Sequence, residues 1–267
     1  MATISLLSDF GMKDAYVAEM KAVILSINPQ ARIIDITHLI NKFSIRMGAY
    51  VLASAAPYFP PNTVHVAVVD PGVGTKRRPI IVETKRSLYV GPDNGLLMLA
   101  AHNEEIIHVY PISNPEYMLS TVSMTFHGRD IFAPAAAHLA AGVVPSKFGT
   151  VIPDYIFPNF AKPHTINGEL VGEVLHIDDF GNIISNISTE DLEKAGLHKV
   201  SSLNVSVGAK TLNLHFCSAY GEVPVDVPLV LISSGNFLEV AVNQGSASAV
   251  FKAKIGDVFC VSVGASS

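Results

Sequence analysis

The sequence has few cysteines, no cluster of basic residues and no long apolar run. Cys217 and Cys260 are its only cysteines, and both lie in strand-like text, which favours two buried thiols over a disulfide framework or a zinc site. The formal net charge is -5, so nucleic acid is not an expected partner. No apolar run approaches the roughly 18 residues that a membrane span requires. The opening "MATISLLSDF" lacks the positive region of a signal peptide, so we expect a cytoplasmic protein.

The first half of the chain alternates between strand-like and helix-like segments. Hydrophobic residues make up 49% of the 267 residues, enough for one large or two modest domains. Alternation of this kind predicts a largely parallel sheet with helices packed on it, an α/β domain over 1–155 that carries the catalytic site. The expected strands are 3–7, 31–36, 63–70, 78–84 and 87–92, and the expected helices are 16–27, 44–59, 94–103 and 130–142.

The pattern changes after a proline-rich stretch that we interpret as a linker over 156–168. Short apolar runs separated by turn residues then predict a smaller all-β domain over 169–267, a barrel or a sandwich. The expected strands are 169–178, 199–207, 210–216, 228–233, 238–243, 247–253 and 257–263.

Two acidic Asp-Phe-Gly turns, "SDFG" at 8–11 and "DDFGN" at 178–182, lie far apart in the chain. A kinase metal-binding turn is excluded, because only seven residues precede the first motif and no glycine-rich loop lies upstream. Asp9 follows the first expected strand, and ligands of open α/β sheets bind beyond the carboxyl ends of strands. Capping of the turn explains Asp9 equally well. Asp14, in the first turn of the next helix, is already explained by the helix dipole.

The segment "VVDPGVGTKRRPI", at 68–80, holds a second group of polar residues. Asp70 ends an apolar strand, the Pro-Gly-Val-Gly turn follows, and Arg77 stands seven residues further on. A carboxylate that faces a guanidinium can hold and polarise a water molecule, although such a pair can also be purely structural. His127, in "TFHGRDIFAP", lies before another expected helix and is a further candidate with the same two interpretations.

A divalent metal is the alternative explanation for these polar residues. No compact motif such as H-x-H or HExxH occurs, and an arginine close to Asp70 disfavours a cation there, so we expect no metal. The residues that could have served as ligands are Asp9, Asp35, His38, His65, Asp70 and His127.

Seven motifs in this order resemble the S-adenosyl-L-methionine (SAM) hydroxide adenosyltransferase family, or SAM hydrolases, which is related to the fluorinases and chlorinases. They are "SDFG", "DAYVAEMK", "VVDPGVGTKRR", "GPDNGLL", "TFHGRDIFAPAAAHLA", "DDFGN" and "SSGNFLEVAVNQGSA". The resemblance implies hydrolysis of SAM to adenosine and L-methionine, with SAM as substrate and no cofactor. It also implies a homotrimer with active sites at the subunit interfaces.

The resemblance assigns a role to individual residues. The catalytic Asp, Arg and His of the family fall on Asp70, Arg77 and His127, whereas the halogenating relatives carry tyrosine at the first position and lack the histidine. Water is therefore the expected nucleophile. The implied substrate contacts are Asp9 at the ribose, Phe43 against the ligand, Asp14, Asp178 and Ser234 at the methionine end, and Phe180, Asn182, Asn243 and Gln244 at the adenine. Gly235 replaces an arginine of the fluorinase, which leaves the contacts of the methionine carboxylate open.

Two other functions fit the same residues. The first is an adenosyl transferase that uses chloride or another halide, which the three hydrolase residues disfavour. The second is a non-catalytic protein that binds SAM and acts as a sensor.

Overall fold

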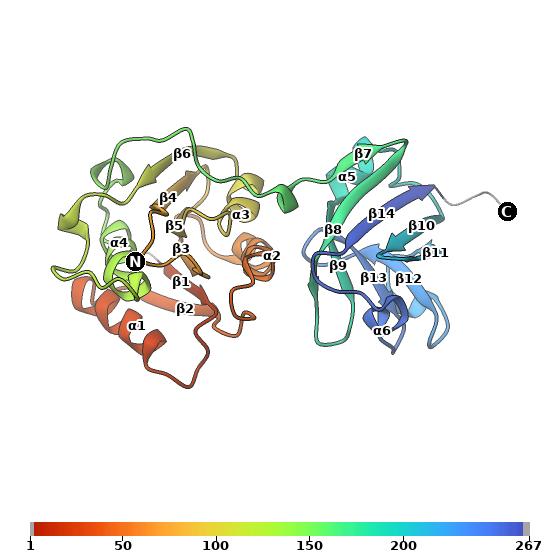
Figure 1. Cartoon of the computed structure of the whole chain (residues 1–267), viewed down its shortest axis with the longest axis horizontal. Coiled ribbons are helices and arrows are strands. Elements are labelled where there is room, and N and C mark those ends of the chain that lie inside the picture. The colour runs from red at the N-terminus through yellow and green to blue at the C-terminus, as the bar shows by residue number, and fades with distance from the viewer. Residues whose placement is uncertain (1–2, 264–267) are drawn as a thin grey trace. The chain divides into compact units, whose positions relative to one another are not determined.

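The computed structural model describes residues 3–263, and the chain divides into two compact units, Met1–Pro158 and Asn159–Ser267 (Figure 1). The segment expected as a linker, 156–168, spans this division. It contains strand β7 (His164–Ile166), which pairs antiparallel with β8 (Glu169–Ile177) in the second unit.

A six-stranded sheet in the order β2-β1-β3-β5-β4-β6 forms the centre of the first unit. Neighbouring strands from β2 to β5 are parallel, and β4 and β6 extend the sheet in antiparallel pairing, which confirms the predicted α/β class. The edge strand β6 is absent from the sequence-based expectation. The strands are β1 (Thr3–Ser8), β2 (Arg32–Thr37), β3 (Val64–Val68), β4 (Pro79–Thr84), β5 (Leu88–Pro92) and β6 (Ile106–Pro111).

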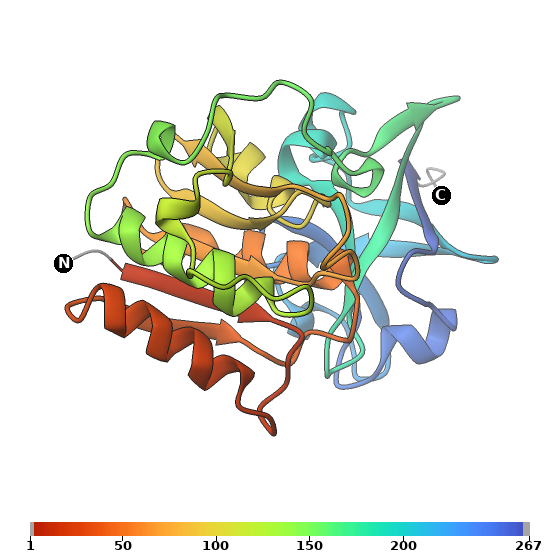
Figure 2. The same cartoon turned by 60° about the vertical axis from the view of Figure 1, so that its left-hand side comes forward.

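Helices cover both faces of this sheet (Figure 1). On one face α1 (Tyr16–Ile27) and α4 (Ala133–Ala140) lie side by side, seen in red and lime green in Figure 2, and share a core with Ile4 and Leu6 of β1. The other face is covered by α2 (Ile45–Ala55) and α3 (Met98–Asn103). Alternate residues of a strand point to opposite faces, so a strand covered on both sides is buried along its whole length and mostly apolar, as β1 and β3 are.

The expected helices exist, but their ends differ. The helix predicted over 44–59 ends at Ala55 and continues as the 3-10 turn Ala56–Tyr58, and the helix predicted from 94 begins at Met98. The helix predicted from 130 is preceded by a π-helical turn, Gly128–Phe132, that leads into α4. No helix within residues 3–263 is long and apolar enough to cross a membrane.

The second unit is a β-barrel closed by pairing of β14 with β8. Seven strands form the barrel, β7 is added to β8, and all neighbours are antiparallel except β11 and β12. The interior is apolar, with Leu203, Val205, Val240 and Phe259 among its buried side chains. The remaining strands are β9 (Ile183–Ser188), β10 (Ser202–Val207), β11 (Lys210–Phe216), β12 (Pro228–Ile232), β13 (Phe237–Val242) and β14 (Val258–Val263).

One predicted strand of the second unit is wrong. The run 247–253 forms helix α6 (Ala247–Phe251), because the Ser246 hydroxyl accepts a hydrogen bond from Ala249 N and so caps a helical turn. Strand β9 and helix α5 (Thr189–Lys194) are further elements that the sequence-based expectation lacks.

Candidate active site

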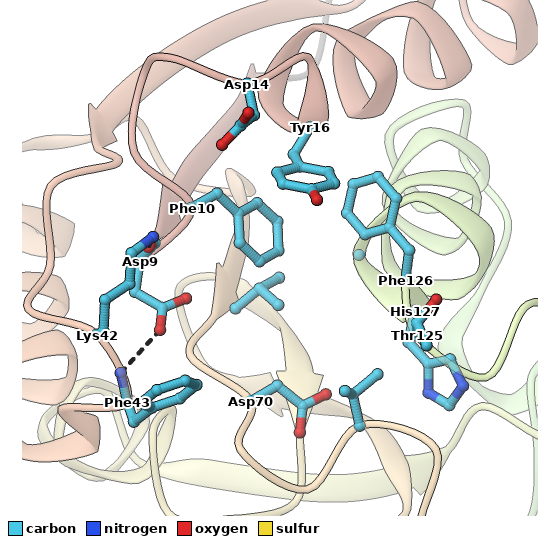
Figure 3. Close-up of a pocket in the computed structure, with 13 residues that line it drawn as sticks. Asp9, Phe10, Asp14, Tyr16, Lys42, Phe43, Asp70, Thr125, Phe126 and His127 are labelled. Atoms are coloured by element: carbon cyan, nitrogen blue, oxygen red, sulfur yellow. Dashed lines mark hydrogen bonds between the residues drawn. The ribbon is translucent and has the colours of Figure 1, made fainter.

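A pocket of about 470 Å³ opens beyond the carboxyl ends of β1 and β3 (Figure 3). Asp9 follows β1 directly, and Asp70 lies two residues after β3. Five of the residues singled out from the sequence therefore share one cavity. The lining residues are Asp9, Phe10, Asp14, Tyr16, Lys42, Phe43, Val68, Asp70, Val73, Thr125, Phe126, His127 and Gly128.

Arg77 connects Asp70 to His127. Its Nε lies 2.9 Å from Asp70 Oδ1, and its Nη2 contacts both Asp70 Oδ2 and His127 Nδ1, the latter at 2.8 Å. The side chains of Arg77 and Asp70 are 9% and 5% exposed, and the Arg77 guanidinium lies over the Phe132 ring. A two-point contact between guanidinium and carboxylate fixes distance and orientation together. Arg77 therefore lies behind Asp70 and holds it, while Asp70 and His127 line the pocket.

This arrangement determines the tautomer of His127. A guanidinium has only donors, so Nδ1 must accept and the proton of the neutral ring stays on Nε2. Burial and the neighbouring Arg77 charge lower the pKa of His127, so the ring is neutral at pH 7. Neutral His127 can offer a donor to a molecule in the pocket without adding a second positive charge there.

Gly74 explains why the glycine loop can reach His127. Its φ is +74°, and a Cβ at this position would lie 2.3 Å from Met124 O. Only glycine permits this approach, which brings the loop that carries Asp70 against the segment that carries His127.

Asp9 is 6% exposed and is held by the loop that carries Phe43. The Phe43 N–H donates to Asp9 Oδ2 at 2.9 Å (dashed in Figure 3), and Lys42 Nζ donates to Asp9 O. The ring of Phe43 is 68% exposed, and its φ of +64° is uncommon for a bulky residue. Such backbone strain is concentrated at ligand sites, where the surrounding structure holds it in place. Asp9 thus keeps one oxygen fixed while its carboxylate faces the cavity.

Aromatic rings form one wall of the pocket, and none of them was predicted as a site residue. The ring centroids of Phe10 and Phe126 are 5.5 Å apart, and Tyr16 lies 5.1 Å from Phe126 (Figure 3). Phe10 belongs to the first Asp-Phe-Gly motif, which is the signal that could have identified it. Lys42 also went unpredicted, although it precedes Phe43 directly. Asp14, by contrast, is exposed at the rim. It precedes α1, which begins at Tyr16, so its expected place in the first turn of the helix is wrong.

The second Asp-Phe-Gly turn, in the second unit, repeats one hydrogen bond of the first. Asp178 Oδ1 accepts from Phe180 N at 3.0 Å, just as Ser8 Oγ accepts from Phe10 N at 3.3 Å. Gly11 and Gly181 follow these aromatic residues, both with positive φ. By position, Asp178 therefore corresponds to Ser8 and not to Asp9.

The other site residues predicted in the second unit lie on three of its turns. Asn182 donates to Asp178 through both N and Nδ2, and the neighbouring Phe180 is 80% exposed. Asn243 Nδ2 donates to Val223 O at 2.7 Å, while Ser234 and Gln244 are exposed. Gly181 O accepts from Ser248 N at the start of α6, which ties the Asp-Phe-Gly turn to the segment that follows Gln244.

The residues weighed as metal ligands do not form one cluster: Asp9, Asp70 and His127 line the pocket, whereas the other three lie elsewhere. His38 contacts Ser8 and Asp35, and His65 contacts Ser5. Among residues 3–263, no group of three or more His, Cys, Asp or Glu side chains is arranged to hold a metal ion.

Comparison with known proteins identifies relatives along nearly the whole chain. The family models of the SAM hydroxide adenosyltransferase N-terminal and C-terminal domains match residues 4–149 and 172–260. An (R)-S-adenosyl-L-methionine hydrolase of Thermus thermophilus is 38% identical, with 96% of this chain and 98% of the relative covered. A fluorinase of an Actinoplanes species is 28% identical, with 95% of each chain covered.

A solved structure also resembles this chain along nearly its whole length. A conserved protein from Thermotoga maritima superimposes with a TM-score of 0.88 at 41% identity, covering 97% of this chain and 99% of that one.

Proposed function

Because the chain belongs to the SAM hydroxide adenosyltransferase family, we propose that it hydrolyses SAM to adenosine and L-methionine. The observation that carries this proposal is the Asp70–Arg77–His127 cluster, in which Asp70 and His127 face the pocket and Arg77 holds both. A carboxylate and a neutral imidazole at one end of a cavity can bind and orient a single water molecule.

In the proposed reaction, this water attacks ribose C5′ and methionine leaves as a neutral thioether. The substrate is already a sulfonium, so the leaving group needs no proton and no Lewis acid, and we propose a metal-independent reaction without a cofactor. Water is a weak nucleophile, since its pKa of about 15.7 leaves little hydroxide at neutral pH. Asp70 accepts a water proton through a lone pair that Arg77 does not use, Arg77 stabilises hydroxide character, and His127 donates from Nε2.

General-base assistance is worth about 10² to 10⁴-fold in rate. Placing the water in line with the C5′–S bond supplies much of the remaining acceleration. The Phe10, Tyr16 and Phe126 wall supports this positioning role, because an apolar surface limits the places where water can bind.

The proposed substrate contacts follow from charge and position. The Asp9 carboxylate can accept both ribose hydroxyl hydrogens, and exposed Phe43 can pack on the ligand. We assign the methionine end to Asp14, Asp178 and Ser234, and the adenine to Phe180, Asn182, Asn243 and Gln244, as the family resemblance implies. In this arrangement Asp178 would have to bind the substrate ammonium while it also caps its own turn.

We further propose a homotrimer in which the second unit of one subunit completes the pocket of the next. Four exposed apolar side chains support this, since they line the pocket or lie within three residues of a lining residue. Large apolar side chains gathered in this way mark protein or ligand interfaces. Their exposures are Met12 63%, Leu39 67%, Phe43 68% and Met124 66%.

The unpaired thiols Cys217 and Cys260 support the cytoplasmic location that we propose for this enzyme. No nucleic-acid or membrane partner is part of the proposal.

Reaction in ¹⁸O-labelled water tests the function, with the label expected on the 5′ oxygen of adenosine. Asp70→Asn is the matched control, because it preserves side-chain shape while removing the charge. This variant should bind SAM and release little adenosine. A 5′-chlorinated nucleoside formed in chloride buffer would instead identify a halide transferase. Binding without any product would identify a sensor.

Mixing two inactive variants tests the shared site. Co-refolded Asp70→Ala and Asp178→Ala chains should recover about a quarter of wild-type activity, because random assembly gives about one intact junction in four. A mixture with proven subunit exchange that is no more active than its components would refute the shared-site trimer.

A further inference from the structure

A buried histidine behind the pocket has no part in the proposed chemistry. His38 is 3% exposed, and its Nδ1 lies 2.7 Å from the hydroxyl of Ser8, the residue that precedes Asp9. Its Nε2 faces Asp35 Oδ1 at 3.2 Å, close but poorly aligned for a hydrogen bond, and Lys21 pairs with the other Asp35 oxygen at 2.6 Å.

The proton positions in this chain follow from the charges. A carboxylate opposite Nε2 favours the tautomer with its proton on Nε2, which leaves Nδ1 as an acceptor. The Ser8 hydroxyl then donates to His38 and accepts from Phe10 N. Burial lowers the pKa of His38, which keeps the ring neutral and Nδ1 able to accept. His38 thus fixes the orientation of the hydroxyl that caps the first Asp-Phe-Gly turn.

The backbone around His38 is shaped for this contact. The register between β1 and β2 shifts after Leu6, which pairs with Asp35, whereas Leu7 pairs with Thr37. An extra residue of this kind bends the strand and redirects the side chains that follow. The carbonyl of His38 also accepts from Gly11 N at 2.8 Å, so His38 holds the turn at both of its ends.

We propose that His38 is a positioning residue for substrate binding, which acts through Ser8 to hold the turn that presents Asp9. His38 is not among the residues that line the pocket, so it acts indirectly. The proposal rests on the assignment of Asp9 to the ribose. It predicts that loss of the Ser8–His38 contact weakens substrate binding and leaves the rate of the bound complex nearly unchanged.

The same strand offers a matched control. Ser5, also on β1, lies 2.7 Å from Nδ1 of His65 on β3, and both residues are fully buried. This pair has the same chemistry and separation, but neither residue lines the pocket. Substitutions of His65 therefore test what loss of a buried Ser–His contact does to the domain in general.

Two variants of similar shape distinguish the contributions of the two ring nitrogens of His38. The oxygen of Asn can take the place of Nδ1 and keep the contact with Ser8, whereas the amide of Gln reaches the place of Nε2 and loses it. We expect His38→Gln to raise KM for SAM about five- to tenfold, the equivalent of one buried hydrogen bond, with kcat within about twofold. His38→Asn should restore a KM close to that of the wild type. His65→Gln and His65→Asn should alter the melting temperature and leave KM unchanged.

Calorimetric dissociation constants for SAM, measured on the same proteins, make the result independent of turnover. A wild-type protein that binds SAM without hydrolysing it would overturn the proposed function, while the order of affinities would still test His38. Equal affinities of His38→Gln and His38→Asn, or an equal loss in the His65 variants, would refute the positioning role. If His38→Gln does not fold, Ser8→Ala removes the same contact, with Ser5→Ala as its control and the same expected difference.

Discussion

Acid should destabilise the first unit through His65, and the size of the effect can be calculated. His65 is fully buried between Ser5 and the Tyr89 ring, on which it stacks at 4.9 Å between ring centroids. Burial, with a smaller contribution from the Arg86 charge, lowers its pKa from 6.5 to about 4. His65 therefore binds a proton near pH 6.5 in the unfolded chain but only near pH 4 in the folded chain. Between these values the unfolded state is favoured as the pH falls.

Each pH unit in this window is worth about 1.4 kcal/mol, so the loss of unfolding free energy is about 2 kcal/mol at pH 5 and about 3 kcal/mol at pH 4. His65→Asn removes the titrating group and keeps an acceptor for Ser5. Its unfolding free energy should therefore decrease less than that of the wild type as the pH falls from 7 to 4. The difference in unfolding free energy between the wild type and the variant should shrink by these amounts. Other histidines with a lowered pKa, such as His138 and His176, contribute equally to both proteins and cancel.

Urea unfolding followed by far-UV circular dichroism measures this difference, because the chain has no tryptophan to report by fluorescence. Protein concentration must be the same throughout, since the stability of an oligomer depends on it. Parallel curves for the wild type and His65→Asn from pH 7 to pH 4 would show that His65 does not titrate as the structure requires. A steeper loss of stability in the variant would contradict the predicted direction of the effect.

Three further predictions concern the pocket. Gly74→Ala should lower kcat/KM by at least tenfold, because a Cβ 2.3 Å from Met124 O must push the two loops apart; stopped-time adenosine assays check this, and wild-type activity would contradict it. Asp9→Asn should weaken SAM binding by about 1.5 to 3 kcal/mol in calorimetry, since a charged acceptor is lost, and an unchanged affinity would leave Asp9 as a holder of Phe43 alone. Chelator treatment should leave turnover unchanged, whereas activity lost with chelator and restored by magnesium or zinc would revive a metal-dependent mechanism.

The sequence predicted best those features that depend on local pattern. The apolar strands β1 and β3 and the polar residues after them were found because a doubly covered strand has few polar positions and ends abruptly at Asp9 or Asp70. The aromatic wall was not found, because Phe10 and Phe126 meet only through the tertiary fold. Helix α6 was mistaken for a strand because a run of seven residues contains too little periodicity, and the cap at Ser246 decides its conformation.

The π-helical turn beside His127 sets the direction in which the His127 imidazole points relative to helix α4. In this turn Ala133 N donates to Gly128 O, five residues back, so it holds one residue more than an α-helical turn would. Deleting one residue here would let the segment become regular α-helix and rotate everything before it by about 100° relative to α4. His127 would then face away from Arg77 even though Asp70, Arg77 and His127 were all still present. The number of residues in this short turn, and not residue identity alone, is therefore a condition for an intact site.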